Sequence, residues 1–412
     1  MPSVAHNIGF ATLGRIIVNL IGIVIVGLMT RALGPERFGQ YNAVFAYLFL
    51  FNVLADMGLY TLLVREISRE GADESSITSK LFTFRLILII ASSVLAIAVA
   101  LILPYTSLVR TGIAIASLSI ICSSLVQVLM GVFQKHLALH WAAITDIATR
   151  LVQLLGIFLL ISWGRAGIIP FIWVVVVAGF VQLFLSILFA RRLIPFRLRI
   201  DIPYWRSMLG ESLPIAVSLI FVLLYFKIDT VMLSLMKPAY DVGVYSVGYK
   251  VLEVVIFFPA MYIGLIMPLL SKFANDSEKF KTIFRRAFLV LAATAIPTVV
   301  GLIIFSKPIV GILGGADFVR DAAPALVILS FAVGIIFFGN LGGNAIIALG
   351  IQRRGMWIYG AGAVFNIIAN LIFIPRYSYL AAAWATVATE LLVTVGMFLL
   401  ILKATRDTAA RL

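Results

Sequence analysis

Long apolar segments are the feature of this sequence that most limits what it can fold into. We count about 12 of them, each close to the ~20 residues with which an α-helix crosses the hydrocarbon core of a bilayer. None alternates polar and apolar residues in the way that marks a membrane β-strand. The sequence therefore predicts an all-α polytopic membrane protein with about 12 transmembrane helices. The segments cover residues 8–33, 39–68, 77–103, 109–133, 138–162, 167–190, 211–236, 240–271, 283–306, 322–349, 356–374 and 378–402.

The composition agrees with this prediction. Hydrophobic residues make up 62% of the 412 positions and charged residues only 12%, whereas soluble domains are nearer one half apolar and one quarter charged. The N-terminal residues have no basic run ahead of a short apolar core, so we expect no cleaved signal peptide. Cys122 is the single cysteine, and no intramolecular disulfide can form.

The placement of the basic residues predicts the topology. The formal net charge of +14 would suggest a nucleic-acid partner in a soluble protein, but here most of it falls on one side of the membrane. Twenty of the 32 lysines and arginines lie in loops or span ends on the side of the N-terminus. This bias predicts that both termini are cytoplasmic, and we expect no nucleic-acid partner. The eight on the other side are Arg31, Arg37, Arg110, Arg165, Lys237, Lys307, Arg320 and Arg376.

The chain divides into two similar halves. The longest segment between spans, residues 191–211, has two prolines, five arginines and a Tyr-Trp pair, which is typical of a cytoplasmic linker along the membrane surface. We therefore expect an N-terminal lobe at 1–190 and a C-terminal lobe at 212–412. Short motifs recur in both lobes, such as FGQY after the first span and VGVY after the seventh. A duplicated six-helix unit explains them and is common in transporters.

Four stretches carry a resemblance to a known family. They are RALGPERFGQY at 31–41, ADMGL at 55–59, GVFQKHL at 131–137, and KIDTVML followed by DVGVYSVGYKV within 227–251. In these stretches the chain resembles the Wzx-type polysaccharide flippases of the multidrug/oligosaccharidyl-lipid/polysaccharide exporter superfamily. The resemblance covers both halves, and its first stretch is the most specific.

The resemblance implies two six-helix lobes around a central cavity that opens alternately to the two sides of the cytoplasmic membrane. It implies a saccharide on an isoprenoid pyrophosphate as cargo, and membrane lipids and other polysaccharide-assembly membrane proteins as partners. No cofactor is expected.

Ionisable residues within the spans are the candidates for function. Each costs at least ~2.5–3.5 kcal/mol at the bilayer centre, so such residues usually face a bundle interior or water. The basic ones suit an anionic pyrophosphate, because arginine and lysine donate strong hydrogen bonds to phosphate. Ion pairing or snorkelling to an interface is the structural alternative, especially for Arg15. The predicted substrate-binding residues are Arg15, Arg150, Lys227 and Lys250.

The acidic residues are candidates for binding a coupling proton or sodium ion, because desolvation favours the protonated carboxyl. We name Asp146, Asp229 and Glu390, with salt-bridge or helix-cap roles as the alternative. For Asp56, beside Gly58, we expect a structural role at a helix break. Recurring amides at 340, 344, 366 and 370 suit sugar hydroxyls, although hydrogen bonding between helices is the simpler interpretation.

Spacing suggests which of these charges pair. Asp146 and Arg150 are four residues apart and Lys250 and Glu253 three apart, so each pair can bond locally. Lys227 and Asp229 are two apart and point about 200° from each other on a helix. We expect Asp229 to contact Lys250 of the next span, which would leave Lys227 free.

Several functions lack their motifs. No phosphate-binding loop and no zinc-binding pattern occur, so ATP hydrolysis and a metal site are not expected.

Two alternatives to a flippase remain. A drug antiporter of the multidrug and toxin extrusion type would favour a cavity dominated by acids. A membrane glycosyltransferase or polymerase would need large outer loops with catalytic acids, and only the loop around Asp317 is a candidate. We expect a transporter rather than an enzyme.

Overall fold

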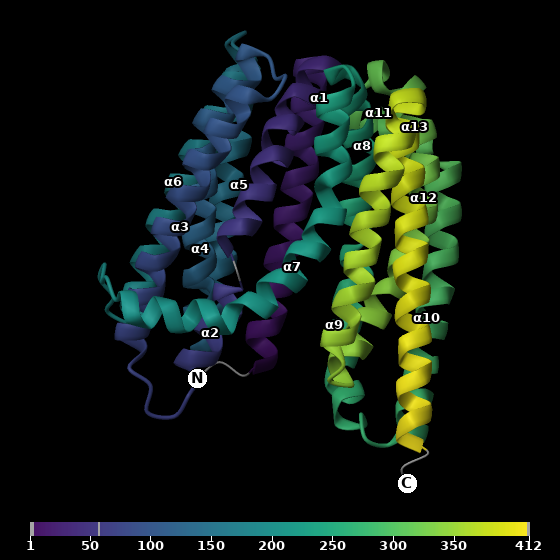
Figure 1. Cartoon of the computed structure of the whole chain (residues 1–412). Helices are drawn as coiled ribbons and strands as arrows, with labels where there is room; N and C mark the ends of the chain where they lie inside the picture. Colours follow the sequence, from purple (N-terminus) through teal and green to yellow (C-terminus); the bar gives the residue numbers. More distant parts are fainter. Residues whose placement is uncertain (1–3, 57, 410–412) are drawn as a thin grey trace. The chain divides into compact units, whose positions relative to one another are not determined.

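The computed structural model describes residues 4–56 and 58–409, and these residues form 13 α-helices with no β-strand among them (Figure 1). Contacts between Cα atoms divide the chain into two compact units, Met1–Leu223 and Leu224–Leu412. The division lies inside α7 (Ile202–Met236), so that this helix contributes to both units.

The first unit is built from six helices and the first part of α7. These helices are α1 (Val4–Asp56), α2 (Leu59–Ile67), α3 (Glu74–Ile102), α4 (Ser107–Lys135), α5 (Leu139–Ser162) and α6 (Ile168–Leu193). The second unit is built from the rest of α7 and six further helices. These are α8 (Ala239–Val255), α9 (Phe257–Lys272), α10 (Ser277–Ile304), α11 (Ser306–Gly314), α12 (Ala316–Ala348) and α13 (Gln352–Ala409).

Two long helices are each interrupted by one residue with a non-helical backbone. Gly34 in α1 has φ 68° and ψ 176°, and Ser378 in α13 has φ 49° and ψ −133°. The apolar stretches around these residues are 55 residues long. A straight helix of that length would measure about 80 Å, whereas the hydrocarbon core of a bilayer is only ~30 Å thick. Each break therefore divides its helix into two crossings.

The number of crossings agrees with the prediction of about 12. Within the described residues, nine helical stretches are long and apolar enough to cross a membrane. Two of these are the interrupted stretches of α1 and α13, and each accounts for two crossings. The 35-residue α7 supplies one more. Each unit then contains six crossings, which confirms the predicted all-α polytopic fold.

Small residues allow the helices of the first unit to pack closely. A Cβ atom on Gly112 of α4 would lie 3.0 Å from side-chain atoms of both Ile172 in α6 and Val44 in α1. On Gly156 of α5, a Cβ would lie 2.8 Å from Val174 of α6. Glycines at such positions bring backbones together in membrane bundles, where association depends on packing rather than on the hydrophobic effect. Helices α1, α4, α5 and α6 thus pack closely against one another.

The second unit is packed around α12 and the two arms of α13. The first arm is residues 352–377 and the second is residues 379–409, on either side of the break at Ser378. A Cβ on Gly362 in the first arm would lie 2.4 Å from Val393 in the second arm. One on Gly396 in the second arm would lie 2.9 Å from Ile358 in the first. The two arms are therefore in close contact along their length, and they hold the polar side chains of α13 against one another.

Candidate functional site

The predicted residues of the first unit lie where α1 packs against α5. A Cβ on Gly14 would come within 2.7 Å of the Cβ of Ala143, so Arg15 on α1 is at the level of Asp146 on α5. Asp146 accepts a hydrogen bond of 2.8 Å from Gln182 Nε2 of α6. Arg15 and Arg150 both interact electrostatically with Asp146. The fold therefore brings all three predicted residues into one polar region.

Two glutamines of this region were not predicted. Gln182 bonds Asp146, and Gln153 Oε1 accepts a hydrogen bond of 2.9 Å from Arg150 Nη1. Asp146 and Arg150 therefore do not pair with each other as their spacing allows. Each is instead hydrogen-bonded to a neutral amide. The signal that could have revealed them is present in the sequence, because each is an amide within a predicted span. Arg15 is exposed and Arg150 half-buried.

In the second unit, Glu253 connects the two predicted lysines. Its Oε1 pairs with Lys227 of α7, and its Oε2 lies 2.7 Å from Lys250 Nζ one turn earlier on α8. The ammonium group of Lys227 also lies 4.5 Å from the centre of the Tyr249 ring. Helix α7 ends at Met236 and α8 begins at Ala239. This short connection makes α7 and α8 consecutive helices, and Lys227 and Glu253 pair across them.

The pairing predicted for these charges is partly wrong. The bond between Lys250 and Glu253 is confirmed. Lys227, however, is not free, because the neighbouring helix supplies Glu253 as a partner. The Lys227–Glu253–Lys250 cluster has two cations for one carboxylate. The exposed fractions of these side chains are 20%, 27% and 38% for Lys227, Glu253 and Lys250, so all three are partly accessible.

Asp229 lies in a different environment from the one predicted. Its side chain is 1% exposed and contacts no lysine directly. Its carboxylate accepts hydrogen bonds from the Tyr245 hydroxyl of α8, from Thr386 Oγ1 of α13 at 3.0 Å and from the Thr230 backbone N–H at 2.7 Å. The expected contact with Lys250 is therefore wrong. Tyr245 and Thr386 reach Asp229 because α7, α8 and the second arm of α13 meet there.

Glu390 is the other buried acid of this unit. It lies on the second arm of α13 and is 5% exposed. Among the described residues, no hydrogen-bond donor or ion-pair partner of Glu390 occurs. Two other oxygens on α13 are also buried and lack hydrogen-bond partners within the described part of the chain: Thr394 Oγ1, four residues after Glu390, and Asn370 Oδ1. Buried oxygens without partners are uncommon in folded proteins, so these groups are available to a proton or cation.

The recurring amides divide into two groups. Asn366 Nδ2 donates to Thr389 Oγ1 at 3.1 Å, between the two arms of α13, and Asn370 Nδ2 donates to Asn366 Oδ1 at 2.9 Å. Asn340 and Asn344 instead donate to carbonyls of their own helix. The simpler interpretation of hydrogen bonding between helices therefore holds for Asn366. Among residues 4–56 and 58–409, no group of three His, Cys, Asp or Glu side chains forms a metal site.

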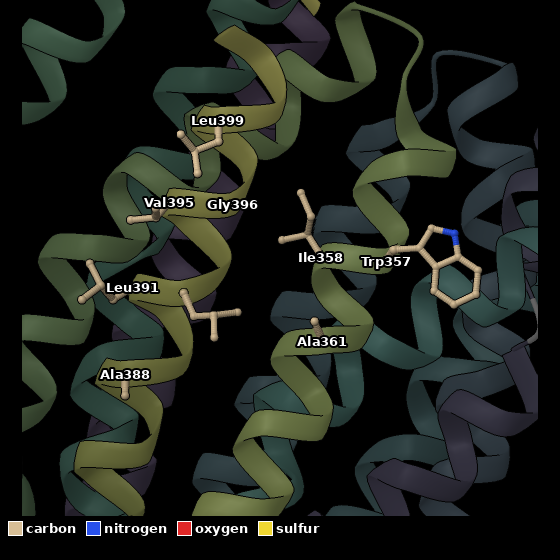
Figure 2. A pocket seen from close by; sticks show the side chains of 9 residues that line it. Trp357, Ile358, Ala361, Ala388, Leu391, Val395, Gly396 and Leu399 are labelled. Atoms are coloured by element: carbon tan, nitrogen blue, oxygen red, sulfur yellow. The ribbon is translucent and has the colours of Figure 1, made fainter. Parts of the chain in front are cut away.

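An apolar pocket that contains none of the predicted residues lies between the two arms of α13. Trp357, Ile358 and Ala361 line it from one arm, and Ala388, Leu391, Leu392, Val395, Gly396 and Leu399 line it from the other (Figure 2). Trp357 is 67% exposed and Leu399 62% exposed, which is usual for side chains that face lipid. The polar groups described above are thus separate from this groove.

Comparison with known proteins identifies the family. Residues 4–274 match the family model described as "Polysaccharide biosynthesis protein", which is more than half of the chain. The chain belongs to the polysaccharide biosynthesis protein family. Residues 214–372 also match the model named MatE. The predicted resemblance to polysaccharide flippases is confirmed.

The chain is also similar to individual proteins. A probable low-salt glycan biosynthesis flippase of Haloferax volcanii is 24% identical over 86% of this chain and 74% of its own length. Among solved structures, the lipid II flippase MurJ in an inward closed conformation has a TM-score of 0.76 at 16% identity, covering 97% of this chain and 90% of its own. An inward-facing multidrug resistance transporter of the MATE family has a TM-score of 0.75 at 12% identity, covering 95% and 96%. These structures share the fold.

Proposed function

We propose that this protein is a flippase that moves a saccharide linked to an isoprenoid pyrophosphate across the cytoplasmic membrane. Membership of the polysaccharide biosynthesis protein family and the similarity to a probable glycan flippase support this function. The observation that carries the proposal is the Lys227–Glu253–Lys250 cluster, in which two lysines share one carboxylate within membrane-spanning helices. A net positive site of this kind needs an anionic ligand to be neutralised.

The chemistry of the cargo matches the predicted basic residues. A pyrophosphate carries several negative charges, and moving it through a bilayer without cations would be very costly. Arg15 and Arg150 offer planar guanidinium groups that can bond two phosphate oxygens at once, and Lys227 and Lys250 offer compact charges. We infer that these four residues bind the headgroup, while the isoprenoid tail stays in the lipid.

Ion coupling is the second part of the proposal. We infer that Asp146, Asp229 and Glu390 take part in binding the proton or sodium ion whose entry drives alternating access. Glu390 is the strongest candidate, because it is buried without a partner among the described residues and lies one turn from Thr394, whose buried hydroxyl also has no partner there. Asp229 is bonded only by neutral donors, which leaves its protonation responsive to a nearby cation.

A multidrug and toxin extrusion-type antiporter is the alternative function. The match of residues 214–372 to the MatE model and the fold shared with MATE transporters favour it. Such a protein would select cationic compounds, for which two lysines on one carboxylate are a poor site. Binding of an anion or of a cation therefore distinguishes the two functions.

Thermal unfolding of the purified full-length protein in detergent tests the proposal. An isoprenoid pyrophosphate is expected to raise Tm, since a ligand that binds only the folded state stabilises it. The corresponding uncharged isoprenol and a cationic dye are not expected to raise Tm.

Lys227→Ala should weaken binding of the pyrophosphate roughly tenfold or more, because it removes a charge-assisted hydrogen bond. Lys272→Ala, at an exposed lysine of the same unit, is the matched control and should bind normally. Stabilisation by the dye alone would favour the antiporter.

A further inference from the structure

The segment between α6 and α7 lies extended along helix α3 of the first unit. Residues 194–201 have no helical structure, and Ile194 has an extended backbone with φ −138° and ψ 131°. Three hydroxyl groups, spaced four residues apart on one face of α3, bond backbone groups spaced two residues apart on this segment. The bonds join Ser75 to the Pro195 carbonyl, Ser79 to the Arg197 N–H at 3.0 Å and Thr83 to the Arg199 N–H at 2.8 Å.

The match between the two spacings follows from backbone geometry. Four residues of an α-helix advance about 6.0 Å, and two residues of an extended chain advance about 6.6 Å. One row of hydroxyls at every fourth position of a helix can therefore bond every second residue of an extended segment. This ladder occupies the side of the segment that faces α3.

Further contacts fix the end of the segment at the start of α7. Lys80 Nζ lies 2.8 Å from Asp201 Oδ2, and the hydrogen bond from Lys80 lowers the pKa of Asp201. The indole N–H of Trp205 donates to the Lys80 carbonyl at 3.0 Å, and its ring stacks on Phe84 at 5.2 Å. The segment is thus attached to the first unit at both ends and in the middle.

The exposed side chains of the segment are basic and apolar, although Arg199 Nη1 also donates to Ser76 Oγ of α3 at 3.1 Å. Asp201 is the only acidic residue in 191–206, and Lys80 already neutralises it. Leu198 and Ile200 are 66% and 70% exposed, between the exposed arginines. We call residues 191–206 the arginine ribbon. Its exposed arginines are Arg191, Arg192, Arg197, Arg199 and Arg206.

We propose that the arginine ribbon binds the phosphate headgroups of anionic phospholipids in the adjacent leaflet. Exposed arginines beside exposed aliphatic side chains are the combination that holds a segment in the interfacial region of an anionic membrane. The five charges are distributed along the segment and do not converge on one point, which suits many singly charged headgroups rather than one pyrophosphate. Leu198 and Ile200 enter the boundary between headgroups and acyl chains. This site is separate from the residues proposed to bind cargo.

The test measures lipid preference rather than transport, so it does not depend on the proposed function. The full-length protein is purified from micelles containing equimolar phosphatidylglycerol and phosphatidylcholine, and the retained lipids are counted by native mass spectrometry. The wild type should retain phosphatidylglycerol preferentially. The triple variant Arg197→Gln, Arg199→Gln, Arg206→Gln should lower this preference roughly tenfold or more, because each basic residue near an anionic surface favours it by about fivefold.

A matched variant controls for net charge. Arg285→Gln, Arg286→Gln, Arg354→Gln removes the same charge from exposed arginines of the second unit and should retain the wild-type preference. An equal loss in both triple variants would overturn the proposal, since the effect would then reflect total charge. Absence of a preference in the wild type would overturn it as well. Displacement of phosphatidylglycerol by stoichiometric isoprenoid pyrophosphate would assign the ribbon to the cargo path instead.

Discussion

Arg85 illustrates how a charged side chain is kept inside a helix bundle. It is 1% exposed, and all parts of its guanidinium group have partners. Nη1 lies 2.8 Å from Asp56 Oδ1 and donates to the Ala55 carbonyl at 2.6 Å. Nε donates to Ser124 Oγ at 2.6 Å and Nη2 to Gln127 Oε1 at 3.0 Å. Arg85 thereby connects α3 and α4 to the C-terminal end of α1.

Replacement of Arg85 should be strongly destabilising. Arg85→Gln leaves Asp56 in a largely buried position without its cation, and breaking a buried ion pair in this way costs about 3–5 kcal/mol. We expect a large decrease in the apparent Tm of the purified protein, measured by fluorescence-monitored unfolding in detergent. Lys281→Gln serves as the control, because Lys281 and Glu278 are 45% and 85% exposed in their pair and exposed pairs contribute at most about 1 kcal/mol. Equal Tm values for the two variants would contradict this role.

For single residues, the sequence predicts which side chains are structural or functional candidates better than it predicts the partners of those side chains. The structural role expected for Asp56 agrees with its bond to Arg85, and the Lys250–Glu253 pair follows from helical spacing. The partners of Lys227 and Asp229 were not predictable, because spacing on one helix gives a direction but does not identify the neighbouring helix. Tertiary contacts with α4 bury Arg85 completely, and no local pattern in the sequence specifies them.

Among the elements, the break in α1 depends on a single glycine. Gly34 has φ 68° and ψ 176°, a conformation that side chains with a Cβ rarely adopt. No atom lies within 4 Å of the position that a Cβ would occupy. The requirement for glycine is therefore a matter of backbone conformation and not of space.

This requirement leads to a prediction that separates conformation from packing. Gly34→Ala should destabilise the protein by about 1–3 kcal/mol, the usual cost of forcing a non-glycine residue into such a region. Gly22→Ala, on the same helix, also meets nothing within 4 Å but has no positive φ. It should leave Tm unchanged or raise it slightly, since alanine favours a helix. The two variants are compared by thermal unfolding, and a Gly34→Ala protein as stable as Gly22→Ala would refute the argument.

The hydroxyl ladder gives a second prediction for an element. The double variant Ser79→Ala, Thr83→Val removes two hydrogen bonds to the arginine ribbon, each contributing about 1 kcal/mol. We expect trypsin to cleave after Arg197 and Arg199 roughly ten- to thirtyfold faster than in the wild type, because cleavage follows the population of the open segment. Fragment masses over time report the rate. Ser123→Ala removes only a bond within α4 and should be cleaved at the wild-type rate; an equal rate in all three proteins would exclude the ladder.

Most of the helices were predictable from the sequence, but the hydrogen bonds that join one element to another were not. Apolar length identified the crossings because a bilayer fixes the length that a helix needs. The segment at 191–211 was recognised from its prolines and arginines. Its bonds to α3 join residues more than 100 positions apart, and no local pattern in the sequence specifies them. The structure also shows that α7 begins at Ile202, within this segment.

For the whole molecule, the number of crossings and the distribution of charge determine the orientation that we propose. Six crossings in each unit place the two termini on the same side of the membrane. The excess of lysine and arginine on that side indicates the cytoplasm, since basic loops remain inside. The motifs FGQY and VGVY both fall at the start of the second crossing of their unit, as a duplicated unit requires.

Cysteine labelling tests this orientation. Cys122→Ala provides a cysteine-free background, because Cys122 is the only cysteine. Into it, Asn275→Cys and Asp317→Cys are introduced separately, at exposed positions on either side of α10. In intact cells an impermeant maleimide should label the Asp317→Cys protein and spare the Asn275→Cys protein until the membrane is permeabilised. The reverse pattern would show that the termini are outside.

Reconstituted flipping tests the central claim most directly. The purified protein is placed in proteoliposomes with a labelled isoprenoid-pyrophosphate oligosaccharide, and an impermeant sugar-modifying reagent detects headgroups that reach the other leaflet. We predict protein-dependent exposure that accelerates with a proton or sodium gradient and that Lys227→Ala reduces at matched protein amounts. Lys272→Ala should transport like the wild type. No exposure of any headgroup, together with gradient-driven movement of a soluble cationic dye, would contradict the flippase and assign Lys227 to a structural ion pair.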